Sequence, residues 1–214
     1  MQIVDKSTIR KLIDNADPAV LLSYIEDAFT YYSSGRAVVP PVGTLSFEKP
    51  PGDVHIKYGY VKDESHYVIK IASGFYQNPE IGLSSSNGLN LVFSQQTGIL
   101  EAVLLDEGFL TDLRTALAGA VVAKHFAPVQ VERIGIVGTG IQARLQLEHL
   151  KGVTDCRKVR VWGRNPVRAS AYAKEMNEMG FEVDIAAEAS EISRSCNLIV
   201  TTTPSEAPLL PYVQ

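Results

Sequence analysis

The spacing of apolar residues near the start of the chain predicts two helices between Lys6 and about Ser34. In the second pattern the apolar side chains fall at helix spacing, at Val20, Leu21, Tyr24, Ile25 and Phe29. Asp17 and Pro18 precede these positions. Aspartate caps free N–H groups and proline suits the first helical turn, so we expect the second helix to begin at this pair.

The next part of the chain has the pattern of β-strands, with apolar residues that alternate with polar ones or form short runs. The segments are "AVVPPVGTLSF", "DVHIKYGYV", "HYVIKIASGF", "GLNLVFSQQ" and "ILEAVLLDE". Turn residues separate several of them, at positions 49–52, 62–64 and 96–98. We therefore expect an antiparallel sheet.

A helix is predicted from about Phe109 to Phe126, and the pattern then changes after Val131. Short apolar runs alternate there with helical patterns, in the order "RIGIVG", "IQARLQLEHLKG", "KVRVWG", "PVRASAYAKEMNEMG", "FEVDIA", "ASEISRS" and "CNLIVTTT". Such an order is typical of parallel α/β structure. The expected fold class is α/β, with an α+β domain over residues 1–127 and a parallel α/β domain over 128–214.

Composition and charge narrow the class of protein. The 214 residues are 45% hydrophobic and 21% charged, as in ordinary soluble globular proteins. A net charge of -4 gives no general attraction to nucleic acid or to anionic membranes. The N-terminal segment lacks the apolar core of a signal peptide, and no apolar run is long enough for a membrane span, so we expect a cytoplasmic protein.

The segment Gly138-Thr139-Gly140-Ile141-Gln142-Ala143 is a GxGxxA form of the dinucleotide-binding motif. It follows a predicted strand and opens a predicted helix, as in a Rossmann-type domain. Its small residues permit a tight turn, close approach of the backbone to a pyrophosphate, and packing of helix on strand. Free N–H groups at the helix start would face the phosphates. The motif alone is weak evidence, but in this context it predicts a bound dinucleotide.

The residues after the second strand of this domain bear on the choice of cofactor. NAD-specific sites usually carry an acidic residue there, which binds the ribose 2′-hydroxyl. Here the segment is Gly163-Arg164-Asn165, with Arg168 one turn later. Because a guanidinium matches a 2′-phosphate in charge and geometry, we predict a preference for NADP(H) over NAD(H). Alternatively, Arg164 lies over the adenine and tolerates either cofactor.

Three cations stand in otherwise apolar segments: Lys57, Lys70 and Arg114. A strand lysine is costly to bury unless it meets an anion, although its ammonium group can also extend to solvent. Arg114 lies near the start of its helix, where a cation opposes the helix dipole, so an anionic ligand there would explain it. His55, near Lys57, is a candidate acid or base but fits a structural role better.

Other catalytic arrangements are not indicated by the sequence. The four histidines are scattered, without the spacing of metal ligands. Ser84-Ser85-Ser86 lacks the GxSxG context of a serine nucleophile. The two cysteines, Cys156 and Cys196, have no CxxC spacing and are expected to be reduced thiols.

The chain resembles the ornithine cyclodeaminase/mu-crystallin family. The segments that carry the resemblance follow in the family's order: "VIKIASGF", "LLDEGFLTDLRTALAGAVVAKHFAP", "IGIVGTGIQARLQLEHL", "VRVWGRN" and "CNLIVTTTPS". The resemblance implies a Rossmann domain joined to an α+β domain that binds substrate and forms a homodimer. Family members act on the carbon–nitrogen bond at the α-carbon of small amino acids, as cyclodeaminases with a recycled NAD, alanine dehydrogenases or NADPH-dependent ketimine reductases.

The resemblance also implies roles for individual residues. Lys70 and Arg114 match the family's catalytic, carboxylate-binding cations, and Thr115 matches a cofactor contact beside Arg114. The pyrophosphate turn matches Gly138, Gly140, Ile141 and Gln142, and the neighbouring Thr139 is included with them. The segment that contacts the adenosine ribose matches Gly163, Arg164, Asn165 and Arg168. The loop beside the cofactor matches Thr203 and Pro204.

Two departures from the family pattern affect the expected site. Gly43 stands where the family commonly has an arginine, and we hypothesise that Lys57 supplies the missing substrate-binding charge. Relatives also continue beyond the position of Gln214 with further strands and a catalytic aspartate. We therefore expect the 214 residues to be a fragment or shortened copy of an enzyme, without the usual proton donor.

Together these features predict an NAD(P)-dependent oxidoreductase for small amino or imino acids. Lys70 and Arg114 would hold the substrate carboxylate and polarise an imine. One alternative is an ornithine cyclodeaminase, and another is a non-catalytic NADP(H)-binding protein like the crystallins.

Overall fold

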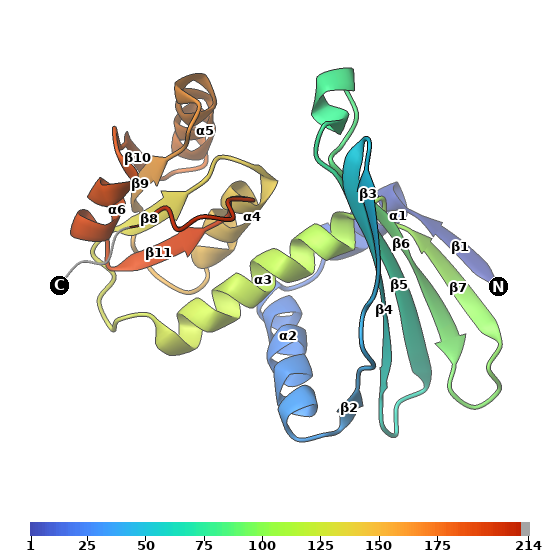
Figure 1. Cartoon of the computed structure of the whole chain (residues 1–214). Coiled ribbons are helices and arrows are strands. Elements are labelled where there is room, and N and C mark those ends of the chain that lie inside the picture. Colours follow the sequence, from blue (N-terminus) through green and yellow to red (C-terminus); the bar gives the residue numbers. More distant parts are fainter. Residues whose placement is uncertain (211–214) are drawn as a thin grey trace. The chain divides into compact units, whose positions relative to one another are not determined.

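The computed structural model describes residues 1–210. They form two compact units, the first from Met1 to Thr111 and the second from Asp112 onward (Figure 1). The sequence predicts a domain boundary between residues 127 and 128. In the structure the boundary falls between Thr111 and Asp112, so most of helix α3 (Phe109–Phe126) belongs to the second unit. Side chains along α3 explain this difference. Ala123 belongs to the hydrophobic core of the second unit, and Gly119 packs closely against Gln146.

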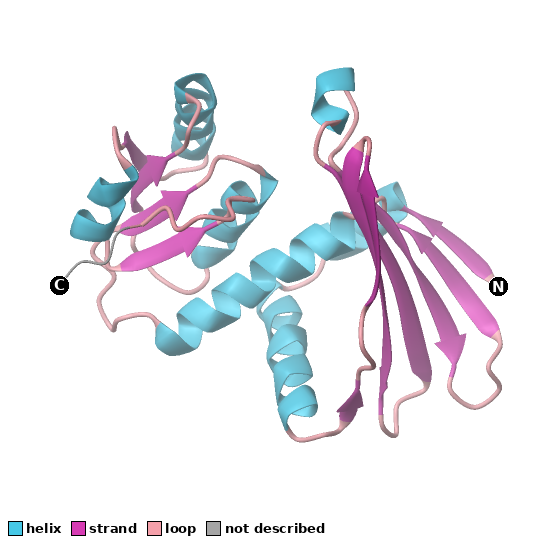
Figure 2. Ribbon diagram, viewed as in Figure 1, coloured by secondary structure: helices cyan, strands magenta, loops and turns pink. Residues whose placement is uncertain are grey.

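The first unit is built on a seven-stranded sheet with two helices, α1 (Lys6–Asp14) and α2 (Pro18–Ser33) (Figure 2). Its strands are β1 (Gln2–Asp5), β2 (Ala37–Val38), β3 (Gly43–Glu48), β4 (Pro51–Val61), β5 (His66–Phe75), β6 (Ser86–Ser94) and β7 (Leu100–Leu105). A short 3-10 helix, η1 (Asn78–Ile81), lies between β5 and β6. The predicted helix start is confirmed, because Asp17 accepts a hydrogen bond from the Ala19 amide and Pro18 is the first residue of α2.

The sheet of the first unit is antiparallel from β2 to β7, as the strand pattern predicts. Strand β1, which the sequence analysis does not predict, makes it a mixed sheet, because β1 pairs in parallel with β7. Asp5 ends β1 and caps α1 by accepting a hydrogen bond from the Thr8 amide. A strand of only four residues is too short to give a clear alternating pattern, and its pairing with β7 depends on the distant part of the chain.

The second unit contains a four-stranded parallel sheet in the order β10-β9-β8-β11. Its strands are β8 (Ile134–Val137), β9 (Lys158–Trp162), β10 (Glu182–Ile185) and β11 (Leu198–Thr201). The helices between them are α4 (Ile141–Leu150), α5 (Pro166–Glu178) and α6 (Ala189–Ser195). Both the predicted alternation of strands and helices and the predicted parallel sheet are confirmed.

The core of the second unit lies on both faces of its sheet. Ile134 and Ile136 of β8 pack in one cluster with Leu147 of α4 and Tyr172 of α5. Val137, the next residue, packs in another cluster with Ile192 of α6. Successive side chains of a strand point to opposite faces, so the helices cover both faces. This is the Rossmann-type arrangement expected from the sequence.

Chain order reverses between neighbouring strands β8 and β11 of this sheet. From β8 the chain passes outward to β9 and β10, and then returns to the other side of β8 to form β11 (Figure 1). In open parallel sheets, ligands bind beyond the carboxyl ends of the strands at such a point. Gly138 directly follows β8 and Thr202 directly follows β11. No helix within residues 1–210 is both long and apolar enough to cross a membrane.

Candidate functional site

The turn after β8 requires glycine at its first position. Gly138 has a φ of +118°, which favours glycine, and a Cβ placed there would lie 2.7 Å from Thr202 Oγ1 and 2.8 Å from Thr202 O. The Gly138 amide donates to Trp162 O at 2.8 Å, and the Thr202 amide donates to Val137 O at 2.8 Å. The turn is therefore held between the ends of β9 and β11. Thr202 is a residue that the sequence analysis missed.

The second glycine of the turn leaves an open space at the start of α4. Gly140 is the N-cap of α4, with an extended backbone (φ -85°, ψ -169°) and no side chain to cap the helix. A Cβ on Gly140 would meet no atom within 4 Å, and Ile141 is exposed. The first amides of a helix lack intrahelical partners and carry the positive end of its dipole. The turn thus fits an anionic group such as a pyrophosphate.

The predicted ribose-binding segment follows β9. Gly163 packs against the turn, because a Cβ there would lie 2.8 Å from Thr139 Cγ2. The Asn165 side chain caps α5, since its Oδ1 accepts from the amides of Val167 at 3.0 Å and Arg168 at 3.1 Å. The side-chain oxygen of Asn165 is therefore used to cap the helix. Arg164 and Arg168 are exposed, and their contact with the cofactor stays a prediction.

Gln142 connects the start of α4 to α3. Its Nε2 donates to Asp112 O at 3.1 Å and to Asp112 Oδ1 at 3.2 Å. Asp112 lies two residues before Arg114, which is exposed on α3. The structure therefore joins the glycine turn to the helix segment that carries Arg114 and Thr115. The contact that the family resemblance implies between Gln142 and the cofactor stays a prediction.

The loop after β11 contains the last two predicted cofactor residues. Thr203 is half-buried and its Oγ1 accepts from the Ser205 amide at 3.4 Å, whereas Pro204 is exposed. Neighbouring Thr202 lies close to Gly138, and its backbone amide donates to Val137 O.

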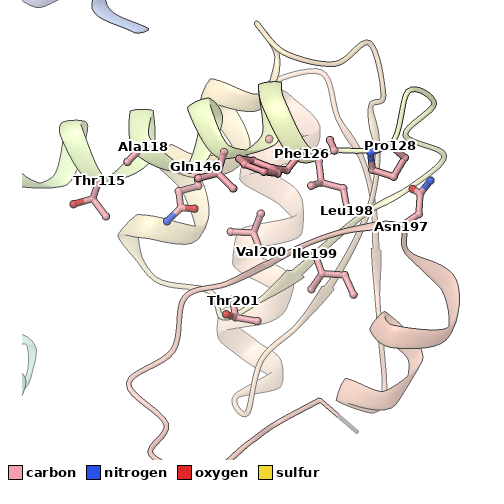
Figure 3. Close-up of a pocket in the computed structure, with 14 residues that line it drawn as sticks. Thr115, Ala118, Phe126, Pro128, Gln146, Asn197, Leu198, Ile199, Val200 and Thr201 are labelled. Carbon is pink, nitrogen blue, oxygen red and sulfur yellow. The ribbon is translucent and has the colours of Figure 1, made fainter. Parts of the chain in front are cut away.

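A pocket of about 450 Å³ lies in the second unit along α3 and β11 (Figure 3). Its walls include Ala118, Val122 and Phe126 of α3 and the apolar residues of β11. Thr115 is the one predicted cofactor residue among those that line it. The pocket is therefore separate from the turn that surrounds Gly140.

In the first unit, strand pairing places the two lysines predicted to bind substrate in one row with a buried asparagine. Lys57 of β4 is paired with Lys70 of β5, and Lys70 is paired with Asn90 of β6. Directly paired residues point to the same face of a sheet, so both ammonium groups share a face. Asn90 is buried and donates to the buried Asp106 carboxylate at 3.2 Å. The two half-buried lysines form the strongest candidate carboxylate-binding group of this unit.

The pairing of β3 with β4 tests the hypothesis that Lys57 replaces a charge lost at Gly43. Gly43 is paired with Ile56, and a Cβ there would lie 3.5 Å from Ile56 Cβ. Adjacent strand residues point to opposite faces, so a side chain at position 43 would lie on the face opposite Lys57. Lys57 does not occupy the place of that side chain. The prediction that Lys57 binds a carboxylate is supported instead by its pairing with Lys70.

His55 lies on the Lys57 face, but both nitrogens of its ring already have neighbours. Thr44 Oγ1 is 3.4 Å from Nδ1, and Asp53 Oδ1 is 3.5 Å from Nε2. Tyr76 donates to the other Asp53 oxygen at 3.0 Å. Burial raises the pKa of Tyr76, and the bond to Asp53 acts in the same direction. These contacts favour the structural role for His55. Among residues 1–210, no group of three or more His, Cys, Asp or Glu side chains could hold a metal ion.

Comparison with known proteins identifies the class to which this fold and glycine turn belong. The model of the ornithine cyclodeaminase/mu-crystallin family matches residues 8–214. The chain belongs to this family.

Individual relatives match nearly all of the chain. A putative dehydrogenase of Rhizobium meliloti is 38% identical over 211 residues, which are 98% of this chain and 64% of the relative. The structure of Thermococcus litoralis Delta(1)-pyrroline-2-carboxylate reductase in complex with NADH and L-proline superposes with a TM-score of 0.88 at 28% identity, over 98% of this chain and 64% of that one. An archaeal alanine dehydrogenase dimer with bound NAD gives a TM-score of 0.87 at 29% identity, over 98% of this chain and 62% of that one. The chain thus spans less than two thirds of the length of these relatives.

Proposed function

We propose that this protein is an NAD(P)-dependent oxidoreductase that acts on the α-carbon C–N bond of small amino or imino acids. The observation that carries the proposal is the glycine turn, with an open space at Gly140 and an uncapped helix start beside it. Relatives of similar fold bind NADH with L-proline, or NAD, which agrees with this chemistry.

The residues of this chain would bind and orient the reactants. Backbone amides at Gly140 and Ile141 would bind the pyrophosphate. Lys57 and Lys70 would bind the substrate carboxylate, and Arg114 is proposed as a further cation for carboxylate and cofactor. Preorganised cations also stabilise negative charge that develops near them and polarise an imine. The nicotinamide, when bound, supplies or accepts the hydride.

We propose a preference for NADP(H), because Arg164 after β9 and Arg168 in the first turn of α5 are exposed, and the segment between them contains no acid. NADPH and NADH titrations followed by nucleotide fluorescence would measure the two dissociation constants. Tighter binding of NADPH is expected, and Arg164→Ala should reduce this preference. Tighter binding of NADH by the unmodified chain would refute the preference while leaving the dinucleotide site intact.

Turnover should be measured on the protein as its gene encodes it, with Δ1-pyrroline-2-carboxylate and with pyruvate plus ammonia as oxidised substrates. Oxidation of NADPH is the expected result. Release of ammonia from ornithine without net reduction of the cofactor would instead identify a cyclodeaminase. Tight cofactor binding without turnover of any of these substrates would indicate a binding protein. The cytoplasmic location expected from the N-terminal residues remains a prediction.

We also propose that the first unit associates with a second copy of the chain. Ile9 is the sole hydrophobic residue within positions 1–111 whose side chain is buried. One face of the sheet, opposite Lys57, carries exposed apolar side chains from paired strands, including Leu45, Phe47, Tyr58 and Tyr60. Apolar surfaces of this kind mark interfaces.

The dimeric state of the archaeal alanine dehydrogenase supports a second copy as the partner. Sedimentation analysis should show a dimer that Tyr58→Asp converts to a monomer, because a carboxylate would be desolvated at the interface. A monomeric unmodified chain at high concentration would refute the proposal.

A further inference from the structure

The side chain of Arg144 binds the backbone of the glycine turn. Arg144 belongs to the first half of α4, and its Nη1 donates to Thr139 O at 2.5 Å and to Gly140 O at 3.1 Å. The Arg144 backbone amide also donates to Gly140 O, but over a longer distance of 3.4 Å. The side chain therefore reinforces the first turn of a helix that has no side-chain cap.

Helix α5 holds the guanidinium group of Arg144 in this position. Its Nε donates to Glu175 Oε2 at 2.6 Å, and its central carbon lies 5.2 Å from the centroid of the Tyr172 ring. Tyr172 is fully buried and its hydroxyl donates to Ala143 O at 3.1 Å. Burial raises the pKa of Tyr172, so the phenol remains a neutral donor. A carboxylate and an aromatic ring thus fix the orientation of the cation.

The two carbonyl contacts determine the direction of two amide groups. In a planar trans peptide the C=O and the following N–H point in opposite directions. The peptide that contains Thr139 O also contains the Gly140 N–H, and the next peptide joins Gly140 O to the Ile141 N–H. When Arg144 binds both oxygens on one side, both N–H groups are directed to the other side.

We propose that Arg144 is the positioning residue of the dinucleotide turn and orients the Gly140 and Ile141 amides toward the pyrophosphate. Arg144 acts through the backbone and does not need to touch the cofactor. Glu175 and Tyr172 hold Arg144 in the required orientation. The inference rests on the proposed dinucleotide binding and assigns the geometry of that site to a side chain outside the GxGxxA motif.

Arg157 offers a matched control in the same unit. Its Nη1 also donates to two backbone carbonyls, Thr154 O at 2.7 Å and Cys156 O at 3.1 Å, and its guanidinium carbon lies 5.8 Å from the Phe181 ring centroid. Arg157 precedes β9, whereas the glycine turn follows β8. Loss of either arginine removes hydrogen bonds to two backbone carbonyls and a contact with an aromatic ring, whereas the bonds to the glycine turn and the ion pair with Glu175 are made by Arg144.

The test compares Arg144→Ala and Arg157→Ala with the unmodified chain, by thermal unfolding and by titration with NADPH and NADH. Arg144→Ala should weaken binding of both nucleotides by about tenfold, because hydrogen bonds from a charged donor are lost. Arg157→Ala should lower Tm, because it also loses two hydrogen bonds to backbone carbonyls, but it should leave both dissociation constants unchanged. Millimolar guanidinium, which can occupy the vacated position, should partly restore nucleotide binding by Arg144→Ala.

Unchanged nucleotide binding by Arg144→Ala would overturn the inference. Equal losses of binding in the two variants would also overturn it, because general destabilisation would then explain both. If the unmodified chain binds neither NADPH nor NADH, the proposed dinucleotide function fails and the inference fails with it. These outcomes are distinguishable because the first two require nucleotide binding by the unmodified chain.

Discussion

Lys57 and Lys70 are direct cross-strand partners on one face of the sheet in the first unit. Like charges placed opposite each other destabilise a sheet. A substrate carboxylate would remove this repulsion by lying between the two ammonium groups. The pair therefore links the stability of the unit to the proposed binding of an amino-acid substrate.

Replacement of Lys57 by glutamine should separate these two effects, because it removes the charge and keeps much of the side-chain length. The free energy of unfolding in urea is expected to rise by about 0.2–1 kcal/mol as the repulsion is relieved. Affinity for L-alanine or L-proline in the presence of oxidised cofactor should fall.

Lys62→Gln is a suitable control for this prediction. Lys62 follows β4, and its Nζ donates to Gly35 O at 2.9 Å. Its replacement should give no gain in stability. Equal stabilities of Lys57→Gln and the unmodified chain would argue against significant repulsion in the pair, and unchanged substrate affinity would exclude Lys57 as a ligand.

The two glycines of the turn should respond differently to alanine. Gly138→Ala places a methyl group against Thr202 at a positive φ, so we expect a loss of about 1–3 kcal/mol in unfolding free energy. Gly140→Ala meets no neighbouring atom and has an ordinary φ, so Tm should change little. NADPH affinity should nevertheless fall, because the methyl group enters the space proposed for the pyrophosphate. Unimpaired NADPH binding by Gly140→Ala would contradict that placement.

Asn165 was predicted to contact the cofactor ribose, whereas its side chain caps α5. Asn165→Ala should lower the free energy of unfolding by about 1 kcal/mol, the usual effect of losing an N-cap. Asn165→Asp preserves an acceptor at the cap and should restore stability. If Asn165→Ala weakens NADPH binding strongly while Tm stays constant, Asn165 is a ligand and the cap is unimportant.

His149 of α4 should make stability depend on pH. Burial lowers the pKa of this half-buried side chain, and the nearby Glu148 opposes that effect. The unfolded chain then binds more protons than the folded chain, so the contribution of His149 is present above about pH 6.5 and is lost as pH falls through the lowered folded pKa. Urea unfolding from about pH 7.5 to about pH 5.5 should show a smaller decrease for His149→Gln than for the unmodified chain. Parallel decreases would count against this role of His149.

Local sequence patterns predicted much of the fold. The helix expected over Phe109 to Phe126 has those bounds, and Asp17 caps α2 as expected. These features depend on residues close together in the chain, so periodicity and capping preferences reveal them. The glycine turn was predictable for the same reason, since its strand, turn and helix are consecutive.

The sequence by itself therefore determined the order of the elements, the Rossmann-type unit and the turn at its centre. Tertiary structure alone decided that Lys57 faces Lys70, that Thr202 meets Gly138, and that Arg144 is held by Glu175. The reason is physical: strand register and contacts between separate elements depend on packing of distant segments, and no local periodicity encodes them.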